Sequence, residues 1–181
     1  MAVQVIVLNG GSSSGKSSIA RCLQSLLPNP WLTIGVDDFL ATLPPAMLAS
    51  EDGIVFAPDG QITVGPGLRA LEAAWSQGVA AMARAGAGII LDLVFLNGAV
   101  AQERWRIVLA DLQVLWVAVK CDPLAAAARE AARGDRVLGM AAVQAYLVHQ
   151  GVDYDMEVDT TRTSPEGCAR LIADRIISRL G

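Results

Sequence analysis

A glycine- and serine-rich segment close to the start of the chain carries residues suited to binding phosphate. Residues 10–17 read GGSSSGKS and match the pattern GxxxxGK[ST] at every fixed position. Glycines let the backbone curl so that successive N–H groups point at phosphate oxygens, while the lysine reaches the β- and γ-phosphates and the final hydroxyl holds Mg²⁺. The alternative, a coincidental Gly/Ser-rich turn, is disfavoured because Lys16 is one of only two lysines in the chain. We therefore predict an ATP site formed by Gly10, Gly11, Ser12, Ser13, Ser14, Gly15, Lys16, Ser17 and Ser18, with Ser17 also binding Mg²⁺.

Three aspartates follow apolar segments, at the places where phosphoryl transfer would need them. Asp92 ends the run Ile89-Ile90-Leu91 and is a candidate Mg²⁺ ligand, the alternative being a strand-end carboxylate bonded to nearby backbone. Asp37 and Asp38 follow the apolar segment 31–36, and a carboxylate there suits orienting an attacking hydroxyl and taking its proton. Adjacent strand residues face opposite sides, so one of the two would be the base and the other would cap the next helix. In the alternative, both are acids favoured by a helix N-terminus.

Three arginines share one helical spacing later in the chain. Arg129, Arg133 and Arg136 stand at i, i+4 and i+7, on one face if a helix runs through Gly134 and Asp135. Three guanidinium groups on one stripe suit a lid that closes over ATP and places positive charge on the transferring phosphoryl group. We take Arg133 and Arg136 as catalytic residues beside Asp37 and Lys16. The alternative is a solvated face paired with Glu130 and Asp135.

The distribution of cations also bears on the acceptor of the phosphoryl group. Between Arg21 and Arg69 the chain has no lysine or arginine, although this interval contains the edge where an acceptor would be held. A phosphate- or carboxylate-bearing acceptor would call for an arginine fork there, so the sequence predicts a neutral acceptor. Apolar residues are available either to bind a lipophilic alcohol or simply to pack the core: Leu43, Pro44, Pro45, Met47, Leu48, Ile54, Val55 and Phe56.

Composition excludes several classes of protein. The chain has 181 residues, 53% of them hydrophobic and 18% charged, with a net charge of −4. That balance predicts a folded chain without bulk attraction for nucleic acid. No apolar stretch is long enough to cross a membrane and no secretory signal is evident, so we expect a cytoplasmic protein. The three scattered cysteines predict buried core residues rather than a metal site. The sequence leaves open whether the chain forms homo-oligomers.

Apolar segments alternate with amphipathic ones along the chain. The former predict five strands, and the near-continuous apolar character of these strands is typical of a parallel sheet covered on both faces. The alternation indicates a doubly wound α/β fold, with residues 53–65 as a small hairpin that leaves the sheet. The predicted strands are 3–9, 31–36, 89–95, 114–121 and 156–160, and the predicted helices are 16–27, 68–85, 99–110, 124–133, 139–149 and 165–180.

Several of these segments together resemble the chloramphenicol phosphotransferases, a family of small kinases. The likeness runs nearly end to end and is carried by residues 8–17, 21–25, 35–37, 101–106, 132–136 and 157–161. It implies a three-layer P-loop NTPase fold of the nucleoside monophosphate/shikimate kinase type, with a five-stranded parallel sheet, a hairpin excursion and a helical lid. It also implies Asp37 as general base, Lys16 and Ser17 as the ATP and Mg²⁺ contacts, and Arg133 and Arg136 as lid residues. Leu93 and Asp38 differ from the family pattern, which has an acidic and a small polar residue there.

The resemblance implies a specific reaction, transfer of the ATP γ-phosphoryl group to the primary hydroxyl of chloramphenicol, which would confer antibiotic resistance. On this interpretation residues 1–181 form one kinase domain, in which 38–68 bind the acceptor and 124–150 form the lid. Two alternatives remain at this point. One is a kinase of another neutral alcohol or of a nucleotide sugar, and the other is a non-catalytic nucleotide-binding module.

Overall fold

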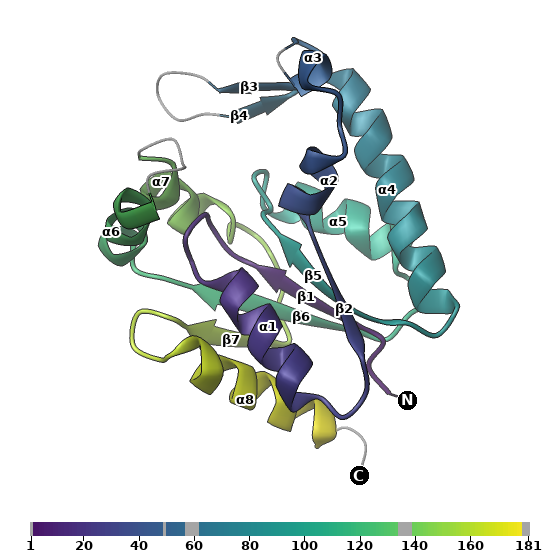
Figure 1. Cartoon of the computed structure of the whole chain (residues 1–181), viewed down its shortest axis with the longest axis vertical. Coiled ribbons are helices and arrows are strands. Elements are labelled where there is room, and N and C mark those ends of the chain that lie inside the picture. Colours follow the sequence, from purple (N-terminus) through teal and green to yellow (C-terminus); the bar gives the residue numbers. More distant parts are fainter. Residues whose placement is uncertain (1, 49, 57–61, 134–138, 179–181) are drawn as a thin grey trace.

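A five-stranded parallel sheet forms the centre of the fold (Figure 1). The structure is a computed structural model that describes residues 2–48, 50–56, 62–133 and 139–178. The strand order is β2-β5-β1-β6-β7, and every neighbouring pair is parallel. The predicted parallel sheet is therefore confirmed. The strands are β1 (Val5–Asn9), β2 (Trp31–Gly35), β5 (Gly88–Leu93), β6 (Val114–Lys120) and β7 (Met156–Asp159).

Helices cover both faces of this sheet, which makes three layers (Figure 1). Side chains alternate along β1: Ile6 and Leu8 pack into one cluster and Val5 and Val7 into the other, all at most 1% exposed. The first cluster is shared with α1 (Lys16–Leu26) and α8 (Pro165–Ile177). The second is shared with α4 (Pro66–Arg84) and α5 (Ala99–Val108). Burial on both faces explains why the strands read as continuous apolar runs.

The segment after β2 differs from the sequence prediction. Two short helices, α2 (Val36–Ala41) and α3 (Pro45–Leu48), follow β2. The sequence predicted that a helix begins near Asp37 and Asp38 but gave no bounds for it, and α3 was not predicted. The apolar Val36 continues the strand pattern, but Gly35 is the N-cap of α2 and the Asp38 carboxylate accepts a hydrogen bond from its N–H at 2.7 Å. This local bond lets a helix begin where periodicity alone predicts one more strand residue.

The predicted hairpin is present as a separate two-stranded antiparallel sheet. β3 (Ile54–Phe56) pairs with β4 (Ile62–Val64), and its turn, residues 57–61, lies outside the described residues. Figure 1 shows the hairpin beyond α2, away from the central sheet. The Gly65 N–H donates to the Gly53 carbonyl at 2.8 Å, and this bond holds the base of the hairpin together.

Two helices, α6 (Pro123–Arg133) and α7 (Met140–Leu147), lie side by side at the end of the sheet where β1 leads into the glycine-rich loop (Figure 1). The predicted arginine stripe would need a helix running past Gly134. α6 is described to Arg133, and residues 134–138 lie outside the described residues. Among the helices that the structure describes, none is long and apolar enough to span a membrane.

Candidate functional site

The glycine-rich loop joins β1 to α1 and has the strongly curled backbone that its sequence predicts. Ser13 and Gly15 have left-handed φ values of 57° and 92°. Gly10 lies so close to β6 that a Cβ there would come within 2.6 Å of the Val119 carbonyl oxygen. Only glycine fits that approach, so both glycines at the fixed positions of the motif have a direct steric or conformational reason.

Two serine hydroxyl groups of this loop have no hydrogen-bond partner among the described residues. Ser14 is 2% exposed, and within the described part of the chain neither its Oγ nor the Oγ of Ser13 has a hydrogen-bond partner. Buried polar groups are normally satisfied, and Ser13 lines the cavity of this loop, so its hydroxyl points to a ligand that brings acceptor oxygens. Most of the predicted loop residues line one cavity, which reaches to Asp92 and Arg129: Ser12, Ser13, Gly15, Lys16, Ser17 and Ser18. This lining is suited to binding the phosphates of a nucleoside triphosphate.

Asp92 joins the two side chains that the motif assigns to phosphate and metal. Its Oδ2 accepts from the Ser17 hydroxyl at 2.6 Å, and its Oδ1 lies 3.6 Å from the Lys16 ammonium group. The Lys16 side chain is 7% exposed and also donates to the Gly11 carbonyl at 2.9 Å. A hydroxyl beside one carboxylate suits Mg²⁺, which keeps several waters and needs few protein ligands beside substrate phosphates. The described residues hold no cluster of three or more His, Cys, Asp or Glu that could bind a metal without such help.

Asp37 and Asp38 both lie in the first turn of α2, at the carboxyl end of β2. They are not the last residues of a strand, so strand alternation does not separate them. Asp38 instead bonds its own helix start through the Gly35 N–H. Asp37 is exposed and lines both the phosphate-loop cavity and a second, apolar cavity. Of the two carboxylates, only Asp37 faces both cavities.

The arginine stripe is only partly described. Arg129 donates to the Thr160 carbonyl at 2.7 Å and to its hydroxyl at 3.1 Å, and Thr160 in turn donates to the Ser14 carbonyl at 2.8 Å. Arg129 thus ties α6 to the loop. The backbone of Arg133 ends α6, while Arg136 lies outside the described residues.

Glu130 is not the solvated partner that one sequence interpretation assumed. It is 1% exposed, and its carboxylate accepts from the backbone N–H groups of Gly139 and Ala141 at 2.7 and 2.8 Å. A carboxylate is stabilised at a helix N-terminus by free N–H groups and by the helix dipole. Glu130 therefore caps α7 from the neighbouring helix, a contact that local spacing does not reveal.

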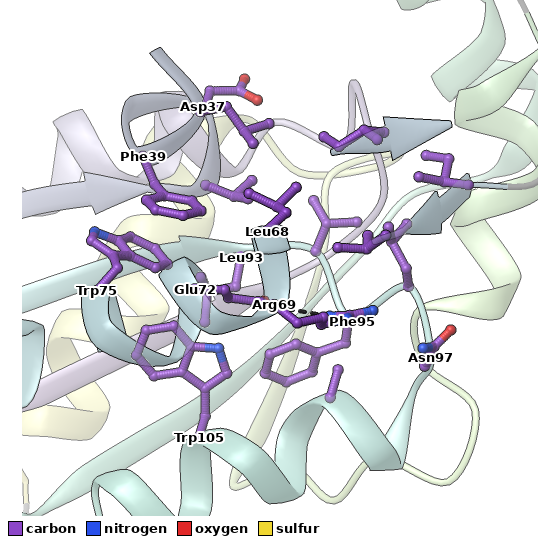
Figure 2. A pocket seen from close by; sticks show the side chains of 18 of the residues that line it. Asp37, Phe39, Leu68, Arg69, Glu72, Trp75, Leu93, Phe95, Asn97 and Trp105 are labelled. Atoms are coloured by element: carbon purple, nitrogen blue, oxygen red, sulfur yellow. Dashed lines mark hydrogen bonds and ion pairs between the residues drawn. The ribbon is translucent and has the colours of Figure 1, made fainter. Parts of the chain in front are cut away.

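The second cavity lies between α2, the hairpin, α4 and the β5–α5 connection, and has a volume of about 170 Å³ (Figure 2). Phe39 stacks on Trp75 with ring centroids 4.9 Å apart, and Trp105 meets Trp75 edge-on at 5.4 Å. Figure 2 places Asp37 at one edge of this group and Trp105 at the other. Leu93 lines the same cavity and is 3% exposed. Such a cavity suits a largely apolar molecule with its polar end toward Asp37.

An ion pair, Arg69 with Glu72, lies in the otherwise apolar lining of this second cavity. Arg69 donates to Glu72 at 2.8 Å, and Arg104 approaches the same carboxylate at 3.9 Å. The cation-free interval of the sequence ends at Arg69, so Arg69 was not among the predicted site residues. Because Glu72 neutralises it, Arg69 does not turn the cavity into an anion site.

The apolar residues proposed for the acceptor contribute unequally. Ile54 of β3 lines the cavity, as do Ile62 and Val64 of β4. Val55 points away and is 44% exposed. The cavity is not lined by Leu43, Pro44, Pro45, Met47 or Leu48, and the Phe56 side chain lies outside what the structure describes. Alternation along a strand explains why Ile54 contributes and Val55 does not.

A buried polar network behind the loop was not predicted. Asn9, the last residue of β1, donates to the Val148 carbonyl at 2.8 Å and to the Tyr154 hydroxyl at 2.6 Å, and it accepts from the Phe95 N–H. The Tyr154 hydroxyl is also 2.6 Å from His149 Nδ1. Burial, with the charges of Lys120 and Lys16, lowers the pKa of His149 to about 4, and burial raises the pKa of Tyr154 to about 12. Both groups are neutral near pH 7, and the network joins β1 to the end of α7.

Comparison with known proteins agrees with this site. The family model described as "Chloramphenicol phosphotransferase-like protein" matches residues 3–177. A protein of Mycobacterium tuberculosis strain H37Rv, provisionally named an O-phosphotransferase, is 34% identical over 180 residues, which cover 92% of this chain and 79% of that protein. Its counterpart in strain CDC 1551 matches equally.

Solved structures of two kinases share the fold. A shikimate kinase from Acinetobacter baumannii in complex with shikimate has a TM-score of 0.65 at 16% identity, over 98% of this chain and 94% of that one. The APS kinase of Mycobacterium tuberculosis in complex with AMPPNP and APS has a TM-score of 0.64 at 16% identity, over 98% of both chains. The predicted P-loop kinase fold is thus confirmed. By its sequence from residue 3 to residue 177, this chain belongs to the chloramphenicol phosphotransferase-like family and is an O-phosphotransferase.

Proposed function

We propose that this enzyme transfers the γ-phosphoryl group of ATP to the primary hydroxyl of a neutral, largely apolar small molecule, with chloramphenicol as the first acceptor to test. The observation that carries the proposal is the position of Asp37, which lines both the phosphate-loop cavity and the apolar cavity. A group at that junction can touch an acceptor hydroxyl and also face the phosphate to be transferred. This is the position that a general base requires.

The roles of the remaining side chains follow from their surroundings. Lys16 and the loop N–H groups would hold the β- and γ-phosphates, while Ser17 and Asp92 would hold Mg²⁺. The metal would neutralise charge on the phosphate oxygens when bound. The hydrogen bond between Ser17 and Asp92, at 2.6 Å, already brings these two groups together. Lys16 lies almost entirely buried, which strengthens its interaction with an anion.

The proposed reaction is a direct displacement at the γ-phosphorus of ATP. The acceptor oxygen forms a bond to the γ-phosphorus while the bond from that phosphorus to the β–γ bridging oxygen breaks. Asp37 takes the hydroxyl proton and later releases it to solvent. Arg133 and Arg136 would add positive charge from the lid, so replacing either with alanine should depress turnover.

A neutral acceptor is supported by the charges that line the apolar cavity. Arg69, the cation in the described lining, is paired with Glu72 at 2.8 Å, so its charge is balanced there. The aromatic residues Phe39, Trp75 and Trp105 offer flat apolar surface instead. These features suit chloramphenicol, as family membership suggests, and they also suit other neutral alcohols.

The test is a direct search for the product. Purified protein is incubated with Mg-ATP and chloramphenicol, and mass spectrometry and phosphorus NMR are used to look for a phosphate ester on the primary hydroxyl. We expect that ester. If ATP binds and no ester forms, chloramphenicol is rejected, and a panel of neutral alcohols and nucleotide sugars identifies the acceptor class. Transfer only to anionic acceptors would overturn the proposal of a neutral one.

A further inference from the structure

The helix α7 lies directly against the glycine-rich loop, although Ser12 of the loop and Gln144 of α7 are 132 positions apart in sequence. A Cβ on Gly11 would come within 3.0 Å of the Ala145 backbone nitrogen and 3.1 Å of Gln144, so any other residue there would force α7 to move by a few tenths of an ångström. At the same place the Ser12 N–H donates to the side-chain oxygen Oε1 of Gln144 at 2.8 Å. One of the loop's backbone donors is thus oriented by a side chain from outside the motif.

Gln144 is buried and faces the cavity of the site. The residue is 6% exposed and lines the same cavity as Lys16, Asp37 and Asp92. Its Oε1 is committed to the Ser12 N–H, and among the described residues none accepts a hydrogen bond from its Nε2 group. A carboxamide nitrogen carries two donors, so Gln144 retains N–H groups for a ligand rich in acceptor oxygens.

The position of Gln144 is fixed from both ends of its helix. Glu130 accepts from the N–H groups of Gly139 and Ala141 at the start of α7. Asn9 donates to the Val148 carbonyl at its end. A donor held by buried contacts needs little reorganisation to meet developing charge, which is the condition for effective electrostatic stabilisation.

We propose that Gln144 is a further phosphate-contacting residue of this enzyme. Its oxygen orients the Ser12 N–H, and its Nε2 donates to the terminal phosphate of a bound nucleoside triphosphate. The inference rests on the proposed function for the nucleotide, but not on the identity of the acceptor. Neither the GxxxxGK[ST] motif nor its spacing includes this residue, which reaches the loop only through the packing of α7.

The test compares nucleotide affinities rather than turnover alone. Calorimetry with Mg-AMPPNP and with Mg-ADP is carried out on the wild type, on Gln144→Met, which has a similar volume without the amide, and on Gln144→Glu. Tyr146→Phe serves as the control, because Tyr146 lies on the same helix, is 71% exposed and does not line the cavity. Thermal melts establish that each variant is folded.

We expect the ratio of AMPPNP affinity to ADP affinity to fall on the order of tenfold or more in Gln144→Met, since a hydrogen bond to a charged phosphate is lost only with the triphosphate. In Gln144→Glu, repulsion between the new carboxylate and the triphosphate should lower this ratio of affinities further. Tyr146→Phe should leave the ratio unchanged. An equal loss for both nucleotides, or none, would overturn the inference and leave Gln144 as a structural support of the loop. If the wild type binds neither nucleotide, the proposed function fails as well, so the two failures are distinguishable.

Discussion

The two cavities that meet at Asp37 are built in different ways. The phosphate-loop cavity is defined by polar contacts of 2.6 to 3.6 Å among Ser17, Asp92, Lys16 and the loop backbone. The apolar cavity is defined by packing, with aromatic rings about its base and one internally neutralised ion pair. Hydrogen bonds require particular atoms at particular positions, whereas apolar packing tolerates exchanges of similar volume. On the proposed function, the first cavity would determine the reaction and the second would leave more freedom in the choice of acceptor.

The largest expected effect comes from the polar cavity. Replacing Lys16 with Met should lower turnover on the order of 10³-fold, since a buried cation facing the phosphates is lost. The matched control is Lys120→Met, which removes the chain's other lysine at the carboxyl end of β6, where it pairs with Glu157 at 3.8 Å and does not line the phosphate-loop cavity. Steady-state kinetics should separate the two. Equal effects from both variants would mean that overall charge, rather than position, matters.

The junction between the cavities gives the next largest effect. Asp37→Asn should lower kcat on the order of 10²-fold or more while nucleotide affinity stays nearly unchanged, because the base is lost and the phosphate contacts remain. Asp38→Ala is the neighbouring comparison and should cost about 1 kcal/mol of stability through the lost helix cap, with kcat retained in the folded enzyme. Kinetics and calorimetry measure the effect of Asp37→Asn, and denaturant unfolding measures the stability of Asp38→Ala. An Asp37→Asn variant that loses ATP affinity as strongly as turnover would contradict the assignment of a base.

A smaller effect should appear in the apolar cavity. Glu72→Gln leaves Arg69 and Arg104 without their neutralising carboxylate, so acceptors that carry a carboxylate should improve relative to neutral ones by about tenfold in kcat/KM. The control is Glu103→Gln on the exposed side of α5. The measurement is a paired acceptor assay with a neutral alcohol and its carboxylate analogue. No change in their ratio would show that Arg69 does not face the acceptor.

The smallest effect concerns stability rather than activity. The pKa of His149 is about 4 in the folded protein against an ordinary 6.5, so between these pH values the unfolded chain binds more protons. Stability should therefore be complete above pH 6.5 and fall as the pH decreases toward 4. Because the ring is partly solvated, we expect a loss on the order of 1 kcal/mol. Denaturant unfolding at several pH values should show this dependence in the wild type and a flatter one in His149→Gln.

Local sequence determined the parts of this protein whose physical cause is local. Glycine spacing and a single lysine define the loop, apolar runs define the five strands, and the hydroxyl of Ser164 caps α8 by accepting from the Gly167 N–H at 3.1 Å. The strand pattern also predicts that Asp37 and Asp92 lie at the carboxyl edge of the sheet, since parallel strands bring their carboxyl ends together. Family resemblance added the reaction class.

Tertiary structure alone decided the contacts that join distant segments. Glu130 caps a helix other than its own, Asn9 of β1 donates to the carbonyl of Val148 at the end of α7, and Gln144 reaches the loop from α7. The start of α2 is by contrast local, because Asp38 bonds back to Gly35, but hydrophobic periodicity does not contain that contact. Periodicity reports which face of an element is buried but not which element it meets. The partners of buried polar groups are therefore fixed only when the layers pack.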